Sequence, residues 1–327
     1  MPAPTDPVAS TARAPVCLIV NPAAGGGRAG RSAPEVVRVL REHGLAVRRE
    51  DTRDLEHARE LARAAAQAGE IAVALGGDGL AGAVADALRE IPGATLGVLP
   101  GGRGNDLARV LGIPRDPLAA CAVIATGASR PLDLGEVDGR AFVGIASAGF
   151  DSEANRIANE APARLGNLVY AYGALRALAS WRPAHFEIEL DPPGERIAFE
   201  GYTVAVANSR NYGGGMQIAP DALLDDGLLD IVLIERVSRW RCVANMPKLF
   251  KGTHTQLPEV RVLRAREVAI SAERPFALYA DGDPIAQLPV RVRALPGTLN
   301  VLLPAGGVVP AAFSGAAVAG AGDAGSR

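Results

Sequence analysis

The sequence predicts two domains of different class, an α/β domain in the first half and a mainly antiparallel β domain in the second half. Up to residue 134, short apolar runs alternate with helix-length segments, which is typical of a parallel sheet with helices on both faces. From residue 135 onward, many short β-rich runs are separated by turn residues, which favours antiparallel strands. The 327 residues are enough for two domains of ordinary size.

The first half yields a regular series of expected elements. Segment 34–43 has apolar residues at helical spacing, and Gly44 after it is a typical helix stop. Strands are expected at 16–20, 46–50, 71–75 and 95–99. Helices are expected at 34–43, 56–68, 80–89 and 107–111.

The second half is expected to be almost entirely β. One helical stretch, 165–181, interrupts it. Strands are expected at 141–145, 185–190, 197–207, 229–234, 259–263, 267–272, 276–280, 290–294 and 299–303. The ends of the chain differ in composition, because 1–14 is rich in Pro, Ala, Ser and Thr and 305–327 in Gly, Ala, Val and Ser. These compositions predict a disordered arm and a flexible tail.

The composition excludes several classes of function. A net charge of −2 and an aromatic content of 4% do not fit a nucleic-acid-binding protein. The three cysteines lack CxxC spacing and the four histidines are scattered, so neither a disulfide framework nor a zinc site is expected. Apolar runs stay well below the ~18 residues of a transmembrane helix. With no signal-peptide pattern at the N-terminus, a cytoplasmic protein is expected.

Three glycine-rich turns directly follow expected strands of the first half. Ligands of open α/β sheets bind beyond the carboxyl ends of the strands, where glycines let backbone N–H groups approach phosphate oxygens. A single such turn is often only conformational, whereas three in one sheet, two of them carrying Asp, predict a phosphate site. The turns are Asn21-Pro22-Ala23-Ala24-Gly25-Gly26-Gly27, Gly76-Gly77-Asp78-Gly79 and Pro100-Gly101-Gly102-Arg103-Gly104-Asn105-Asp106.

The turns do not belong to the commonest nucleotide-binding motifs. GxxxxGK[ST] is missing, so a P-loop kinase is excluded. A GxGxxG that opens a βαβ unit before a ribose-binding acid is missing too, so hydride transfer is disfavoured.

A series of motifs resembles the diacylglycerol kinase catalytic-domain family, which includes bacterial soluble lipid kinases and sphingosine kinases. The motifs occur in the family's order and cover nearly all of residues 15–304. They are Asn21-Pro22-x-x-Gly25, Gly76-Gly77-Asp78-Gly79, Leu99-Pro100-Gly101-Gly102-Arg103-Gly104-Asn105-Asp106-Leu107-Ala108, Leu132-Asp133-Leu134-Gly135, Gly149-Phe150-Asp151, Tyr212-Gly213-Gly214-Gly215-Met216, Leu224-Asp225-Asp226-Gly227-Leu228-Leu229-Asp230 and Asp281-Gly282-Asp283-Pro284.

The resemblance implies both a fold and a reaction. The fold would be a Rossmann-like nucleotide-binding domain at 15–134 beside a β-sandwich domain at 135–304, as in NAD kinase and diacylglycerol kinase, with the active site in the cleft. The reaction would move the γ-phosphoryl group of ATP, with Mg²⁺, to the hydroxyl of diacylglycerol or a related lipid, giving phosphatidic acid. A lipid substrate implies transient peripheral contact with the membrane surface. A homodimer is left open.

The resemblance also assigns roles to individual residues. The expected ATP-binding residues are Asn21, Pro22, Gly25, Thr52, Gly76, Gly77, Asp78, Gly79, Leu80, Gly102, Arg103 and Asn105. The acidic network that holds catalytic Mg²⁺ would comprise Asp78, Asp106 and Asp133. A second metal would bind the carbonyls of Leu223 and Leu228 and the carboxylate of Asp226. The alternative for this last site is an ordinary Asp-Gly turn.

Three positions depart from the family's pattern. Leu80 and Arg103 stand where the family usually has Thr, and Asp283 stands where it usually has Glu. Arg103 could replace a hydroxyl by a bidentate phosphate contact, whereas Leu80 cannot donate a hydrogen bond.

Asp281 and Asp283 are the expected catalytic carboxylates. In an extended segment, side chains two residues apart project to the same side, so both would face the cleft. Their proximity would favour uptake of a proton, which suits a general base. An Asp-Gly hairpin turn before Pro284 is the conformational alternative. The resemblance favours catalysis, with Asp283 in the position of the family's Glu and Asp281 orienting the acceptor or sharing the proton.

Two other functions fit parts of the pattern. A NAD kinase shares the Gly-Gly-Asp-Gly loop but has a different acceptor, and the motifs around Asn105 and Asp281 favour the lipid kinases over it. A nucleotide-binding regulator without catalysis is conceivable because of Leu80.

Overall fold

The computed structural model describes residues 14–161, 168–191, 194–305 and 310–314. The first domain contains a parallel sheet in the order β2-β1-β3-β4. All residues of β1 and β3 are buried, as expected for a parallel sheet covered on both faces. The strands are β1 (Val16–Val20), β2 (Val47–Asp51), β3 (Ile71–Gly76) and β4 (Thr95–Pro100).

Helices cover both faces of this parallel sheet. From β1 the chain moves to β2 in one direction, and then returns past β1 to β3 and on to β4 in the other. Right-handed crossovers therefore place the first helix on one face and the next two on the opposite face. The packing agrees, because α1 contacts α5 and α2 contacts α3. The helices are α1 (Ala24–Glu42), α2 (Leu55–Gln67), α3 (Asp78–Leu88), α4 (Asp106–Val110) and α5 (Pro117–Thr126).

The second domain is built from antiparallel strands around its own apolar core. In β8, buried residues alternate with more exposed ones, because one face of the strand packs on this core. The two-stranded ribbon β10–β11 stands apart from the main sheet. The strands are β5 (Ala128–Val137), β6 (Arg140–Phe142), β7 (Ile145–Gly149), β8 (Ala184–Asp191), β9 (Glu195–Ala207), β10 (Asn211–Tyr212), β11 (Met216–Gln217), β12 (Leu229–Glu235), β13 (Val260–Ala265), β14 (Glu267–Ala272), β15 (Ala277–Ala280), β16 (Asp283–Gln287) and β17 (Val290–Leu303).

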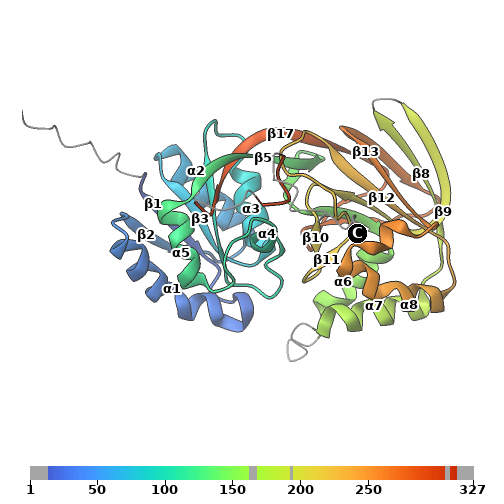
Figure 1. The fold of residues 1–327 in the computed structure, drawn as a ribbon, viewed down its shortest axis with the longest axis horizontal. Helices are drawn as coiled ribbons and strands as arrows, with labels where there is room; N and C mark the ends of the chain where they lie inside the picture. Colours follow the sequence, from blue (N-terminus) through green and yellow to red (C-terminus); the bar gives the residue numbers. More distant parts are fainter. Residues whose placement is uncertain (1–13, 162–167, 192–193, 306–309, 315–327) are drawn as a thin grey trace, which may run out of the picture.

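Three helices and a short 3₁₀ helix accompany the β domain. Figure 1 shows α6, α7 and α8 gathered at one end of it, below the strands. They are α6 (Phe150–Glu160), α7 (Leu168–Ser180), α8 (Arg239–Lys251) and η2 (Thr253–Gln256). Within the described ranges, none of the helices combines the length and apolar character that a membrane crossing requires.

Strand β17 connects the two domains. Its first half pairs antiparallel with β14, and its second half pairs parallel with β4 of the first domain. It also follows β5 along most of its length. In Figure 1, β17 and β5 run together across the top of the molecule from one domain to the other. Fifteen strands of the described chain therefore form one hydrogen-bonded sheet.

The predicted order, an α/β domain followed by a β-sandwich domain, is confirmed. Several details differ from expectation, among them the strands β5, β10, β11 and β16, which were not expected. The runs 290–294 and 299–303 form the single strand β17, and α5, α6 and α8 were not expected. Part of the expected tail is ordered, because Phe313 is buried in the α/β core and the Ala312 carbonyl accepts a hydrogen bond from the Leu224 amide. Residues 1–13, 306–309 and 315–327 lie outside the described ranges.

Candidate active site

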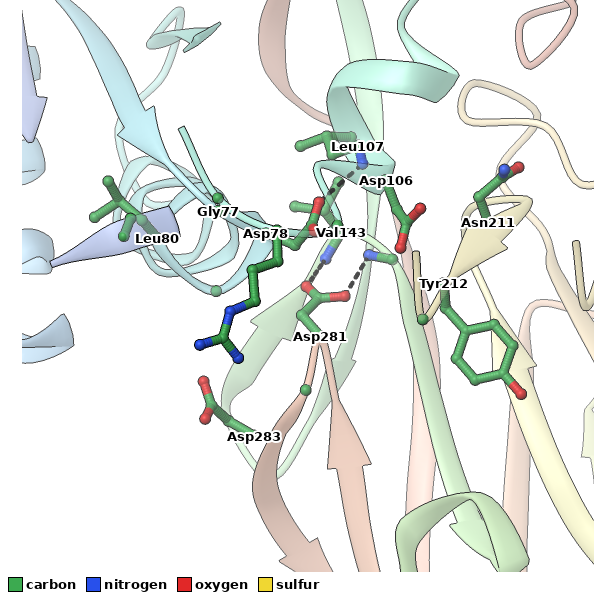
Figure 2. A pocket seen from close by; sticks show the side chains of 18 of the residues that line it. Gly77, Asp78, Leu80, Asp106, Leu107, Val143, Asn211, Tyr212, Asp281 and Asp283 are labelled. Atoms are coloured by element: carbon green, nitrogen blue, oxygen red, sulfur yellow. Dashed lines mark hydrogen bonds between the residues drawn. The ribbon is translucent and has the colours of Figure 1, made fainter. Parts of the chain in front are cut away.

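A cavity of about 510 Å³ lies between the domains, at the carboxyl ends of β1, β3 and β4. The three glycine turns form one wall, and residues that follow β6, β9 and β15 form the other. This is the edge of the sheet at which strand order reverses beside β1, where open α/β sheets bind ligands. Figure 2 shows Asp78, Asp106 and Asp281 around one space, with Asp283 set apart from them.

The first glycine turn opens helix α1. Gly25, Gly26 and Gly27 all have positive φ angles, of 61°, 68° and 83°. A side chain at Gly25 would also collide, because its Cβ would lie 2.4 Å from the Gly101 carbonyl oxygen. The Arg28 guanidinium donates a hydrogen bond to the Gly102 carbonyl and so ties this turn to the third one. Three successive amides in this conformation form a concave surface suited to a phosphate.

The second and third turns pack directly on each other. The amides of Gly101 and Gly102 both donate to the Gly76 carbonyl, at 2.7 and 2.9 Å. A Cβ on Gly102 would lie 2.4 Å from the Gly77 Cα, so only glycine fits there. Asn105 shapes the third turn, because its side-chain oxygen accepts from the Gly102 amide and its side-chain nitrogen donates to the Gly102 carbonyl. Asn105 thus serves the backbone rather than pointing to a ligand.

Asp78 and Asp106 are brought together at the centre of the cleft. Asp78 begins α3, and its Oδ1 accepts from the Leu107 amide at 3.0 Å. Asp106 begins α4, accepts from the Gly214 amide at 2.7 Å and pairs with Arg109. Burial, and then the nearby charge of Asp106, raise the pKa of Asp78 to about 6. Two carboxylates in one buried site favour a cation between them.

Asp281 occupies the hairpin between β15 and β16. Its backbone has a φ of 51° and Gly282 one of 96°, so the segment is a tight turn. The expectation of an extended segment with both carboxylates on one side was therefore wrong, and the hairpin alternative was right. Both residues nevertheless line the cavity.

The carboxylate of Asp281 is held by the backbone of the opposite segment. Its oxygens accept from the amides of Val143 and Gly144, at 2.9 and 2.8 Å. Glycines make room for it, because a Cβ on Gly82 would lie 2.9 Å from Asp281 Oδ2. Burial raises the pKa of Asp281 to about 6, with a further contribution from the Asp78 charge. Burial also raises the pKa of Asp283, which faces the charges of Arg140 and Arg59 instead.

Other residues expected at the nucleotide occupy different surroundings. Arg103 is exposed and lines the cleft, whereas Leu80 is buried in the α/β core and reaches the cavity only at its edge. Thr52 is buried away from the cleft, where its hydroxyl donates to the Asp54 carbonyl at the start of α2. Pro22 packs against Gly30 of α1. The structure thus brings Asn21, Gly25, Gly77, Gly79, Gly102 and Arg103 to the cavity.

Asp133 does not join Asp78 and Asp106. Its two oxygens accept from the amides of Gly227 and Gly297, both at 2.6 Å, so it ties β5 to the loop before β12 and to β17. Asp226 is engaged as well, because it accepts from the Leu228 amide at 3.0 Å and pairs with Arg264. Asp226 thus has one backbone amide and one guanidinium as partners, as Asp106 has with Gly214 and Arg109, and its part in a second metal site stays a prediction.

The donor set at the centre of the cleft suits Mg²⁺. Within the residues that the structure describes, no group of three or more His, Cys, Asp or Glu side chains could hold a metal. Mg²⁺ commonly binds one or two carboxylates and completes its shell with water and substrate phosphates. Asp78 and Asp106 provide two such carboxylates, and the three glycine turns beside them are where substrate phosphates are expected.

An apolar pocket of about 300 Å³ adjoins the cleft. Tyr212 and Gly213 line both spaces, so they mark the junction. The Tyr212 hydroxyl hydrogen-bonds to the buried Asp151, whose pKa is raised to about 6 by burial. No sequence motif indicates this pocket, because its walls combine single residues of distant segments. They include Phe150, Leu178, Tyr202, Met216, Ile234, Cys242, Met246, Leu249 and Phe250.

Comparison with known proteins agrees with this arrangement. The family model described as the diacylglycerol kinase catalytic domain matches residues 15–137. The model described as the YegS C-terminal NAD kinase beta sandwich-like domain matches residues 144–303. The crystal structure of a diacylglycerol kinase from Bacillus anthracis has a TM-score of 0.71 at 22% identity and covers 89% of this chain and 97% of its own, which shows the shared fold.

Two relatives are similar along nearly their whole length. The diacylglycerol kinase of Mycobacterium tuberculosis is 36% identical over 299 residues, which covers 88% of this chain and 95% of the relative. The diacylglycerol kinase of Bacillus subtilis is 29% identical over 293 residues, with the same coverage of 88% and 95%. The chain therefore belongs to the diacylglycerol kinase family of lipid kinases.

Proposed function

We propose that the protein transfers the γ-phosphoryl group of ATP to the hydroxyl of diacylglycerol and so produces phosphatidic acid. One observation carries the proposal: a polar cleft with clustered carboxylates adjoins an apolar pocket, and Tyr212 and Gly213 line both. The polar cleft suits a triphosphate, and the apolar pocket suits an acyl chain. Membership of a lipid kinase family supports the same reaction.

The nucleotide is expected on the side of the α/β domain. Phosphoryl transfer depends mainly on positioning and on stabilising charge at the phosphates. The glycine turns offer backbone amides for this, and the N-terminus of α3 adds the positive end of its dipole. Arg103 is the cation of this wall and would pair with phosphate oxygens.

Asp78 and Asp106 are the residues that would hold Mg²⁺. When bound, Mg²⁺ would neutralise charge on the β- and γ-phosphates. The surroundings of Asp78 favour a cation there, because burial and then the nearby charge of Asp106 raise the pKa of Asp78.

Asp281 is the proposed general base. A pKa of about 6 leaves it ionised at neutral pH and able to accept a proton there. The lipid hydroxyl oxygen would form a bond to the γ-phosphorus of ATP. At the same time the bond between that phosphorus and the oxygen that bridges it to the β-phosphorus would break. The hydroxyl proton passes to Asp281, and ADP leaves. Asp283 lies farther from the carboxylate cluster (Figure 2), and we assign it to orienting the acceptor.

The apolar pocket would receive one end of an acyl chain. Its walls include residues of α6, α7, α8, β9 and β12, so it lies in the β domain. Burial of each methylene contributes about 0.8 kcal/mol, so a few methylenes suffice to select a lipid over a polar alcohol. NAD, the acceptor of a NAD kinase, has no acyl chain to place in such a pocket.

A kinase assay with a panel of acceptors tests the proposal. Purified protein receives labelled ATP, Mg²⁺ and, in parallel, diacylglycerol, related lipids or NAD, and products are identified by mass. Diacylglycerol should be phosphorylated, and Leu249→Glu in the pocket should lower kcat/KM for it at least about tenfold. Val262→Glu, at an exposed apolar residue of β13, is the matched control. Phosphorylation of NAD alone would establish a NAD kinase, and ATP binding without any transfer would establish a regulator.

A further inference from the structure

Helix α8 has no buried residue. One side of it nevertheless faces the apolar pocket, through Cys242, Met246 and Leu249. A helix of a folded domain normally buries one apolar stripe and exposes a polar one. The side of α8 that faces away from the pocket also carries apolar residues. Such a surface indicates contact with something outside the described chain.

A second apolar stripe runs along the exposed surface of α8. It consists of Trp240, Val243, Pro247 and Phe250, spaced by three, four and three residues, so all four lie on one side of the helix. Trp240 is 85% exposed and Phe250 is 51% exposed. An indole exposed to this degree is uncommon, because Trp is highly buried on average. Phe250 also lines the pocket, so the stripe meets the pocket mouth.

Positive charge flanks the stripe. The helix carries four cationic side chains and no acidic one, although the whole chain has a net charge of −2. Arg239 and Arg241 lie in its first turn, and Lys248 and Lys251 lie in its last. Arg241 pairs with Glu259, whereas Arg239, Lys248 and Lys251 take part in none of the ion pairs among the described residues.

We infer that α8 is a membrane-binding helix that lies on an anionic bilayer, with Trp240 and Phe250 in the interface and Lys248 and Lys251 at the lipid phosphates. An apolar stripe with Trp and Phe flanked by Lys and Arg is the pattern of interfacial helices, and charge complementarity selects an anionic surface. The contact would place the pocket mouth at the acyl chains. Its role in catalysis therefore rests on the proposed function, although the contact itself does not.

Tryptophan fluorescence and vesicle sedimentation test the contact directly. The chain has two tryptophans, and Trp181 is 9% exposed, so a blue shift on vesicle binding must come from Trp240. Vesicles of phosphatidylcholine with phosphatidylglycerol should bind and shift the emission, and vesicles of phosphatidylcholine alone should bind at least about tenfold more weakly. Trp240→Phe should retain binding and lose the shift.

Charge reversal gives the matched comparison. Lys248→Glu with Lys251→Glu should weaken binding to the anionic vesicles at least about tenfold. Arg196→Glu with Arg291→Glu changes the net charge equally on exposed strand residues and should leave binding unchanged. Equal loss in both double variants would show a nonspecific charge effect and overturn the inference. So would a lack of binding by the wild type, or a dimer that Trp240→Glu converts to a monomer without affecting vesicle binding.

Activity separates this inference from the proposed function. Trp240→Glu should lower turnover of diacylglycerol in vesicles at least about fivefold and leave turnover of a short-chain diacylglycerol dissolved as monomers unchanged. Equal loss on both substrates would place Trp240 in the fold and overturn its membrane role. A wild-type chain that binds anionic vesicles but phosphorylates no lipid would overturn the proposed function and leave the membrane contact standing.

Discussion

At the scale of single residues, the protonation of Asp281 should control turnover. Its pKa of about 6 means that the carboxylate loses its basic form as the pH falls below that value. The rate constant kcat should therefore rise with pH through about 6 and level off above about 7. The measurement is kcat at saturating ATP and lipid from pH 5 to pH 8.

Two conservative variants distinguish the base from its neighbour. Asp281→Asn should reduce kcat about 100-fold or more and remove the rise near pH 6, with ATP affinity retained. Asp283→Asn should lower kcat less and keep the pH profile. A profile that persists in Asp281→Asn but is lost in Asp283→Asn would assign the base to Asp283, the position that the family resemblance favours.

Asp151 should make stability depend on pH. Its folded-state pKa, about 6, lies above the ordinary value because of burial, and one of its oxygens has no hydrogen-bond partner. A raised carboxyl pKa stabilises the folded state below the unfolded pKa, and this contribution is lost as the pH rises through about 6. A shift of two units corresponds to about 3 kcal/mol.

The test compares wild type with Asp151→Asn in urea unfolding at pH 4 and pH 8. Because Asn does not ionise, the free energy of unfolding of the variant relative to wild type should increase by about 2–3 kcal/mol between the two pH values. A difference that does not change with pH would show that Asp151 titrates normally in the folded protein.

At the scale of elements, Asp133 should act as a structural clamp. Its side chain satisfies the amides of Gly227 and Gly297, which belong to two segments distant in sequence. Asp133→Ala would leave both donors without this acceptor, and the free energy of unfolding should fall by about 2–4 kcal/mol. Thermal unfolding and Mg²⁺ titration of activity are the measurements. An unchanged melting temperature with a higher Mg²⁺ requirement would instead support the metal-binding role that the resemblance implies.

The elements also show what sequence could predict. Strands β1, β3 and β4 and their glycine turns were predictable because each has a local signal, an apolar run that leads into a glycine-rich turn. Strand β17 was divided in two because Pro296 and Gly297 indicate a turn, whereas in the structure they fall at a shift of register between Leu295 and Leu299. Helix α8 was missed because it has no buried stripe and contains Pro247.

Within the candidate site, the sequence predicted well which residues line the cleft. It predicted less well which partners these residues contact. Asp78, Asp281 and Arg103 line it as expected. The partners of Asp133 and the support of Asp281 by Val143 and Gly144 could not be predicted, because these contacts join residues more than 90 positions apart. Position relative to a strand end is local information, whereas hydrogen-bond partners across a domain boundary are not.

At the scale of the whole molecule, the cleft joins two domains that share one sheet. Strand β17 pairs with β14 and then with β4 along one edge, and with β5 along the other edge. Contacts across the cleft reinforce this link, because Asp106 of the first domain accepts from the Gly214 amide of the second. Removal of β17 would expose strand edges and apolar surface in both domains.

The two domains should therefore unfold as one cooperative unit. Differential scanning calorimetry should give a single transition whose calorimetric and van't Hoff enthalpies agree. Saturating ATP with Mg²⁺, at 100 times its dissociation constant, should add about 2.7 kcal/mol and move the entire transition, since ligand binding then stabilises both domains. Pro296→Gly, at the register shift of β17, should lower the melting temperature while keeping one peak. Two separate transitions, of which ATP shifts only one, would show that β17 does not couple the domains.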